Sequence, residues 1–116
     1  MGNHLLTFDI GTTGVKAGLF TADGNLVDTA YQEYSVIYPR PQWVEQSISE
    51  MWEAQSRISK MLIERTNIQP EEIAAIGVSC QRATFVPVDE NEQPLMNFIG
   101  WQDKRSIQQC EKMHDL

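Results

Sequence analysis

The sequence has few of the residues that build metal centres, disulfide frameworks or nucleic-acid surfaces. Its 116 residues include only two cysteines and two histidines, and Cys80 and Cys110 stand too far apart to form a metal-binding pair. We therefore expect two reduced thiols, as is usual in a cytoplasmic protein. Basic residues are also scarce, because nine Lys and Arg face sixteen Asp and Glu, for a formal net charge of −7. This balance argues against nucleic acid as a partner, since such a surface needs a basic stripe.

Long apolar runs are missing as well. No stretch approaches the roughly 20 apolar residues of a membrane-spanning helix. The start of the chain lacks the basic region and the small-residue cleavage site of a signal peptide. What remains is an ordinary globular composition, with 41% hydrophobic and 22% charged residues. We expect one small cytoplasmic α/β domain without a membrane partner.

Alternation of apolar and polar residues predicts three strands at the start of the chain. Residues 5–10 and 15–20 alternate with the period of two that is typical of a half-buried strand. Asp23 and Gly24 then provide a tight turn before a third strand over residues 26–34. We expect these strands to form an antiparallel three-stranded meander, followed by a loop that Pro39 and Pro41 interrupt.

A helix is predicted over residues 47–66, where Met51, Trp52 and Ile58 belong to an apolar stripe at helical spacing. Residues 73–80 are apolar on both sides, which predicts a buried strand parallel to the first, with the helix as the crossover. Cys80 is accordingly expected to be a small buried residue, and Trp43 and Trp52 are expected to be packing residues rather than ligand contacts. Two short strands around a polar turn within residues 84–101 and a helix starting near residue 103 complete the pattern.

The stretch FDIGTTGVKAGLF, residues 8–20, places polar groups between two strands. The turn itself consists of four small residues, Gly11, Thr12, Thr13 and Gly14. Its N–H groups and hydroxyls can surround a phosphate, because small residues let a ligand approach the backbone closely. Asp9 before the turn can hold Mg²⁺, and Lys16 after it can reach a phosphate as a point charge. The pattern suits a nucleoside triphosphate and its metal, and a purely structural turn is the alternative.

Four segments in order resemble the FGGY carbohydrate kinases, which belong to the actin–hexokinase–Hsp70 ATPase superfamily. They are FDIGTTGVKAGLFTADGNLV, QWVEQSISEMWEA, IAAIGVSCQR and GWQDKR, and the resemblance extends over nearly the whole chain. It implies a ribonuclease H-like fold of the actin type, with the meander, the crossover helix and the parallel strand. It also implies a kinase that transfers the γ-phosphate of ATP to a hydroxyl of a sugar or polyol, with ATP and Mg²⁺ as cofactors.

The resemblance implies a role for each matching residue. Asp9 places Mg²⁺, while the turn and Lys16 hold the ATP phosphates. The substrate cleft is implied to be lined by five residues, Gln81, Arg82, Trp101, Gln102 and Asp103. The catalytic base is an aspartate expected beyond Leu116. Residues 1–116 are therefore expected to be the N-terminal part of a first kinase domain, inactive when isolated.

The substrate stays open at this point. Ala83 stands where glycerol-type members carry Glu, and the Met-His pair of xylulose-type members is missing. Arg82 could instead be a surface charge, and Trp101 could be a core residue. A different class of function also remains, in which the chain is a non-catalytic module that binds a sugar or a partner protein. A small sugar or polyol is the expected partner, and the sequence is compatible with a homodimer.

Overall fold

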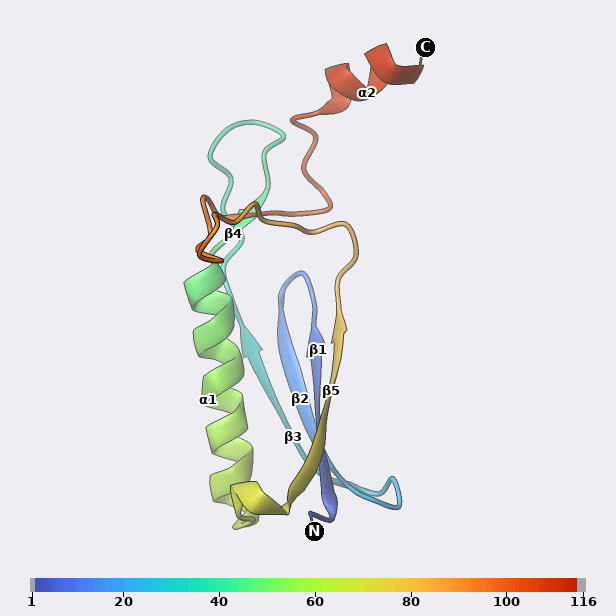
Figure 1. Cartoon of the computed structure of the whole chain (residues 1–116), viewed down its shortest axis with the longest axis vertical. Coiled ribbons are helices and arrows are strands. Elements are labelled where there is room, and N and C mark those ends of the chain that lie inside the picture. The colour runs from blue at the N-terminus through green and yellow to red at the C-terminus, as the bar shows by residue number, and fades with distance from the viewer. Residues whose placement is uncertain (1, 115–116) are drawn as a thin grey trace. The chain divides into compact units, whose positions relative to one another are not determined.

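The computed structural model describes residues 2–114, which separate into two compact units. The first unit takes in the chain up to Tyr34 together with Ser49–Gln81. The second unit takes in Ser35–Ile48 together with the chain from Arg82 onward. Figure 1 labels the helices and strands of both units.

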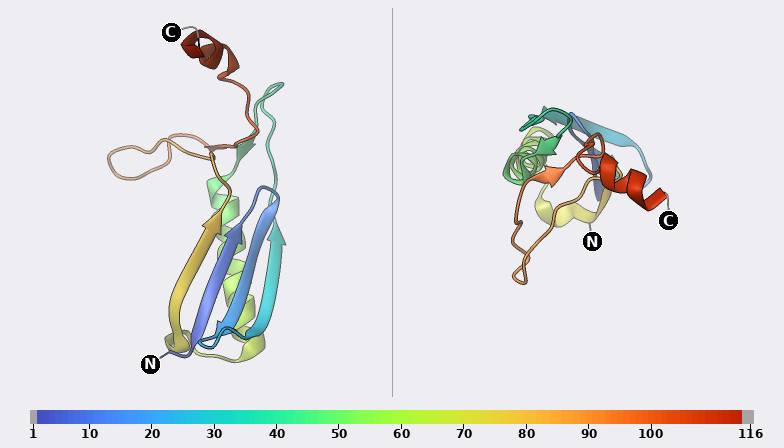
Figure 2. Two further views of the ribbon diagram at one scale, coloured as in Figure 1. Left: turned by 90° about the vertical axis from the view of Figure 1, so that its right-hand side faces the viewer. Right: turned by 90° about the horizontal axis from the view of Figure 1, so that it is seen from above.

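One four-stranded sheet forms the first unit. Its strands are β1 (His4–Ile10), β2 (Gly14–Thr21), β3 (Leu26–Glu33) and β5 (Ile73–Cys80), in the order β3-β2-β1-β5. The pairs β1–β2 and β2–β3 are antiparallel, and β5 runs parallel to β1 (Figure 2). Gly24 has a φ of 86° in the turn between β2 and β3, a conformation that glycine adopts at no steric cost. The predicted meander and parallel strand are confirmed.

Helix α1 (Ile48–Thr66) lies against one face of this sheet and leads through the 3₁₀ turn η1 (Pro70–Glu72) into β5 (Figure 1). Most of the buried apolar side chains of this unit come from the first three strands and from the helix: Leu6, Val15, Ala17, Leu19, Ala30, Met51, Ala54, Ile58 and Leu62. Arg65 near the end of α1 forms an ion pair with Asp28 on β3. Trp52 is 68% exposed, so the prediction that it is a packing residue was wrong.

Strand β5 is not the buried strand that its apolar sequence predicted. Ile76 and Val78 lie on the same side as Leu6 of β1, yet each is 62% exposed. A helix is roughly 10–12 Å wide and strands lie about 4.8 Å apart, so one helix covers only two or three strands. The fourth strand is left uncovered, and Cys80 at its end is exposed rather than buried, as a free thiol.

The second unit contains little regular structure. Strands β4 (Glu45–Gln46) and β6 (Phe98–Ile99) pair antiparallel, and single bridges join Phe85 to Ile99 and Val88 to Pro94. Helix α2 (Ile107–His114) confirms the predicted final helix. Among the residues that the structure describes, no helix is long and apolar enough to cross a membrane.

The turn between the two bridged segments holds a residue with an unfavourable backbone conformation. The N–H of Asp89 donates to the carbonyl of Gln93 at 2.9 Å, and Glu92 between them has a φ of 61°. A non-glycine residue in this left-handed region costs about 1–2 kcal/mol, whereas the greater freedom of glycine in the unfolded chain costs about 0.5–1 kcal/mol.

We therefore expect Glu92→Gly to stabilise the chain by about 0.5 kcal/mol, measured as a higher midpoint of denaturant unfolding. Glu90→Gly is the matched control, because Glu90 is exposed in the same turn and has no positive φ. This control is expected to lower the stability slightly. A loss of stability of the same size in both variants would contradict the explanation.

Candidate functional site

The turn between β1 and β2 closes with a hydrogen bond from the N–H of Gly11 to the carbonyl of Gly14, at 2.9 Å. No residue in positions 11–14 has a positive φ. The turn therefore differs from many anion-binding nests, in which one residue adopts the left-handed conformation. Gly14 is sterically required, because a Cβ there would lie 2.6 Å from the carbonyl oxygen of Gln32 on β3. The small residues predicted as a phosphate site thus form a closed, tightly packed turn.

Gln81 joins the turn to the end of β5. Its backbone N–H donates to the carbonyl of Ile10 at 2.9 Å, and its side-chain Oε1 accepts a hydrogen bond from the Thr12 hydroxyl at 3.0 Å. Sequence reasoning placed Thr12 in a phosphate site and Gln81 in a substrate site. The structure brings these two residues into direct contact.

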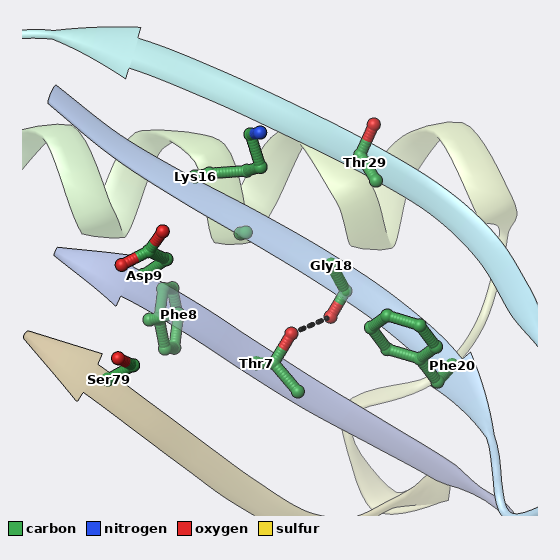
Figure 3. A pocket seen from close by; sticks show the side chains of 9 residues that line it. Thr7, Phe8, Asp9, Lys16, Gly18, Phe20, Thr29 and Ser79 are labelled. Atoms are coloured by element: carbon green, nitrogen blue, oxygen red, sulfur yellow. Dashed lines mark hydrogen bonds between the residues drawn. The ribbon is translucent and has the colours of Figure 1, made fainter. Parts of the chain in front are cut away.

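The face of the sheet opposite α1 carries polar residues in register. Asp9 on β1 pairs with Lys16 on β2 and with Ser79 on β5, so the three side chains form one row across the sheet. Figure 3 shows them at the edge of a shallow hollow of about 360 Å³. In the next row the Thr7 hydroxyl donates to the carbonyl of Gly18 at 3.2 Å. An anionic and a cationic side chain therefore lie together beside the turn.

Asp9 could act as the single protein ligand of a Mg²⁺ ion that is otherwise coordinated by water and phosphate. Its carboxylate is exposed on the open face of the sheet, and Mg²⁺ usually keeps several waters and binds one or two carboxylates plus phosphate oxygens. Within residues 2–114 no group of three or more His, Cys, Asp or Glu side chains could hold a metal ion alone. A metal bound here would need phosphate oxygens and water to complete its coordination.

The other predicted substrate residues belong to the second unit. Arg82 and Gln102 are exposed, and Trp101 is 55% exposed rather than part of a core. Trp101 and Gln102 occupy a turn that the N–H of Asp103 closes by donating to the carbonyl of Gly100 at 3.0 Å. Gly100 in turn donates its N–H to the carbonyl of Val44 at 2.9 Å.

The side chain of Asp103 is enclosed, in contrast to those of its neighbours in this turn. Its side chain is 2% exposed, and each carboxylate oxygen accepts two hydrogen bonds. Oδ2 accepts from the Val44 N–H at 2.7 Å and from Arg105 Nη2 at 2.8 Å. Oδ1 accepts from the backbone N–H of Arg105 at 2.8 Å and from its Nε at 2.9 Å. The four acceptor positions of this carboxylate are filled within the chain, which leaves none for the substrate hydroxyl that sequence reasoning gave it.

Arg105 links Asp103 to two further residues. Its Nη2 lies 2.9 Å from a carboxylate oxygen of Glu45, and its guanidinium lies 3.9 Å from the centroid of the Trp43 ring. Trp43 therefore packs as predicted, although its partner is a cation rather than an apolar side chain. Hydrogen bonding to Arg105 lowers the pKa of Asp103 to about 2, and the same bond raises the pKa of Arg105.

Sequence reasoning missed Tyr34, Arg105 and Glu45. Tyr34 is buried beside the phosphate turn, and its hydroxyl donates toward the carbonyls of Gly11 and Gly14. Arg105 and Glu45 were present in the segments used for the resemblance, but a charged residue by itself gives no sign of its partner. A tyrosine that ends a strand could have been noted as a polar group at the end of the sheet.

Comparison with known proteins gives consistent matches over nearly the whole chain. The profile of the FGGY family of carbohydrate kinases, N-terminal domain, matches residues 4–116. A glycerol kinase from Thermococcus onnurineus is 42% identical over 113 residues, which make up 97% of this chain and 23% of that protein. A glycerol kinase 2 from Thermotoga maritima is 41% identical over 113 residues. The chain thus spans about 23% of the length of these relatives.

Solved structures give the same picture. A xylulose kinase from Brucella ovis superposes with a TM-score of 0.87 at 31% identity, over 95% of this chain and 23% of that one. A Plasmodium falciparum glycerol kinase with ADP superposes with a TM-score of 0.86 over 98% of this chain and 23% of its own. At 21% identity the second match supports the fold alone. These superpositions match the observed mixed sheet and its helix.

Proposed function

Because the chain belongs to the FGGY family of carbohydrate kinases, we propose that it forms the N-terminal part of the first domain of an ATP-dependent kinase. This kinase transfers the γ-phosphate of ATP to a hydroxyl of a sugar or polyol. The observation that carries the proposal is the contact between Thr12 and Gln81, at 3.0 Å. This contact joins the predicted phosphate turn to the first of the predicted substrate residues.

Each residue of the turn has a proposed task. The backbone and hydroxyl groups of the turn hold phosphate oxygens; its members are Gly11, Thr12, Thr13 and Gly14. Lys16 adds a positive charge on the open face beside Asp9. Mg²⁺, held by Asp9 directly or through water, would neutralise charge on the phosphates. Such fixed groups favour phosphoryl transfer because the developing charge meets dipoles that are already oriented.

The substrate side is proposed to use exposed residues of the second unit. Arg82 and Gln102 can donate hydrogen bonds to hydroxyls, and Trp101 offers a flat apolar surface to the C–H face of a sugar or polyol. Asp103 is assigned to holding the turn of Trp101 and Gln102 through Val44 and Arg105. The chain lacks an assigned catalytic base, which we propose to lie in the part of the kinase that follows these residues.

A chimeric enzyme tests the proposal. Residues 1–116 would replace the matching segment of the Thermococcus onnurineus glycerol kinase, which is 42% identical over 113 residues. We expect the chimera to form ADP from Mg·ATP in the presence of at least one member of a panel of polyols, pentoses and hexoses. The isolated 116-residue chain is the control and is expected to show only background turnover.

The chimera must first be shown to be folded, by circular dichroism and by a single cooperative unfolding transition. A folded chimera that phosphorylates no member of the panel would contradict the kinase proposal. It would favour the alternative, a non-catalytic module that retains the fold and binds a sugar or a partner protein.

A further inference from the structure

The phenol of Tyr34 contacts the phosphate turn from the interior of the first unit. Tyr34 directly follows β3, and only 6% of its surface is exposed. Its hydroxyl donates toward the carbonyl oxygens of Gly11 and Gly14, the latter at 3.1 Å. Its backbone N–H donates to the carbonyl of Thr13 at 3.3 Å. Three carbonyl groups of the turn are therefore directed at one residue.

This arrangement fixes the direction of the N–H groups as well. The carbonyl and the N–H of a trans peptide point in opposite directions, and none of the described peptide bonds is cis. With the carbonyls of Gly11 and Thr13 turned toward Tyr34, the N–H groups of Thr12 and Gly14 point away from it. An anion on the side of the turn opposite Tyr34 would therefore approach these two N–H groups.

The carbonyls of Thr13 and Gly14 also accept bonds from backbone N–H groups, those of Tyr34 and Gly11, so without the hydroxyl it is the Gly11 carbonyl that would be weakly held. The turn begins and ends with glycines, whose peptide planes rotate at low steric cost. A carbonyl rotated outward would present its negative end to a phosphate oxygen and would repel it. Burial raises the pKa of Tyr34 to about 12, with smaller contributions from Tyr31 and Asp9, so the phenol keeps its proton at physiological pH.

We propose that Tyr34 is a positioning residue, which holds the carbonyls of the turn inward so that its N–H groups face the phosphates of a bound nucleotide. The inference rests on the proposed function, because it assumes that the turn binds phosphate. It adds a requirement that the family resemblance did not supply, namely a buried hydroxyl behind the turn.

Titration of the ¹⁵N-labelled 116-residue chain with Mg·ATP, followed by NMR, tests this inference. In the parent chain the amide signals of Thr12, Thr13 and Gly14 are expected to shift. Tyr34→Phe retains the ring and removes only the hydroxyl, and we expect it to weaken Mg·ATP binding about five-fold or more. Mg·AMP, which lacks the outer phosphates, is expected to bind equally weakly to both forms.

Two control variants separate positioning from stability. Tyr38→Phe removes a hydroxyl from a residue that is 69% exposed and is expected to bind Mg·ATP like the parent. Ile58→Val destabilises the core by about 0.5–1.5 kcal/mol without touching the turn, and it is expected to keep the parent affinity in the folded state.

Equal affinity of Tyr34→Phe and the parent chain would overturn the inference and leave the phosphate site intact. An equal loss in Ile58→Val would overturn it too, because the effect would then follow stability alone. If Mg·ATP left the turn signals of the parent unshifted, the proposed phosphate site would fail, and the inference with it.

Discussion

Replacing Asp103 by alanine is expected to lower the free energy of unfolding by about 1–3 kcal/mol. The substitution removes the acceptor of four hydrogen bonds and leaves the N–H of Val44, itself 8% exposed, without its partner. It also leaves the Arg105 guanidinium with Glu45 as its remaining carboxylate. The main cost is the Val44 N–H, because a buried donor that loses its partner keeps its desolvation penalty.

Denaturant unfolding followed by tryptophan fluorescence measures this loss, since Trp43 stacks on Arg105 and should report its release. Glu90→Ala, at an exposed position of the same unit, is the control and is expected to change stability by less than about 0.5 kcal/mol. If Asp103→Ala were as stable as this control but bound a sugar or polyol less tightly, the carboxylate would act on the substrate directly.

The same carboxylate gives stability a defined pH dependence. The pKa of Asp103 falls from 3.8 to about 2 on folding, mainly through its bond to Arg105. A depressed pKa means that the unfolded chain binds the proton more readily, so this stabilisation is complete above about pH 4. It is lost as the pH falls toward 2, and the loss should be absent in Asp103→Asn.

Asp9→Ala in the chimeric kinase is expected to reduce kcat by about 10²–10³-fold, the range seen when one oriented transition-state contact is removed. The reason is that Asp9 is the carboxylate beside the turn on the open face, where the metal is proposed to bind. The KM for the sugar or polyol is expected to change little, because the strand partners of Asp9 are Lys16 and Ser79, neither of which is a proposed substrate residue. The Mg²⁺ concentration that gives half-maximal rate should rise.

Asp23→Ala is the matched control, because Asp23 is an exposed carboxylate in the turn between β2 and β3. Its kinetics are expected to equal those of the unmodified chimera. A wild-type kcat and an unchanged Mg²⁺ requirement in Asp9→Ala would remove Asp9 from the proposed metal site.

Much of the fold could be predicted because it depends on local pattern. Alternation over the first three strands, helical spacing over α1 and the glycine at position 24 each act within a few residues. The parallel pairing of β5 followed from the crossover rule, which needs only the order of the elements. The exposure of β5 depends on which elements pack against its faces, and the sequence of the strand itself does not determine this.

The site shows the same division. Asp9, Lys16 and the turn between them could be predicted because they are adjacent in the sequence. The bond from Val44 to Asp103 spans 59 positions, and the contacts of Tyr34 with the turn span 20 and 23 positions. Both contacts depend on how distant segments come together. The sequence identified Asp103 as a hydrogen-bond acceptor, but it could not show that its donors are Val44 and Arg105.

The uncovered strand β5 has a consequence for the chain in concentrated solution. It ends the strand order, so within the described residues its outer edge has no partner strand, and its eight residues carry no charge. Natural edge strands are usually guarded by lysine, proline or a bulge against pairing with a neighbouring molecule. The register of β5 against β1 shifts between Ile73 and Ala75, but the rest of the strand, with Ile76 and Val78 exposed, has no such protection. This part of β5 is where copies of the chain would be expected to associate as their concentration rises. The time for which the chain stays monomeric in solution would then depend on its concentration as well as on its free energy of folding.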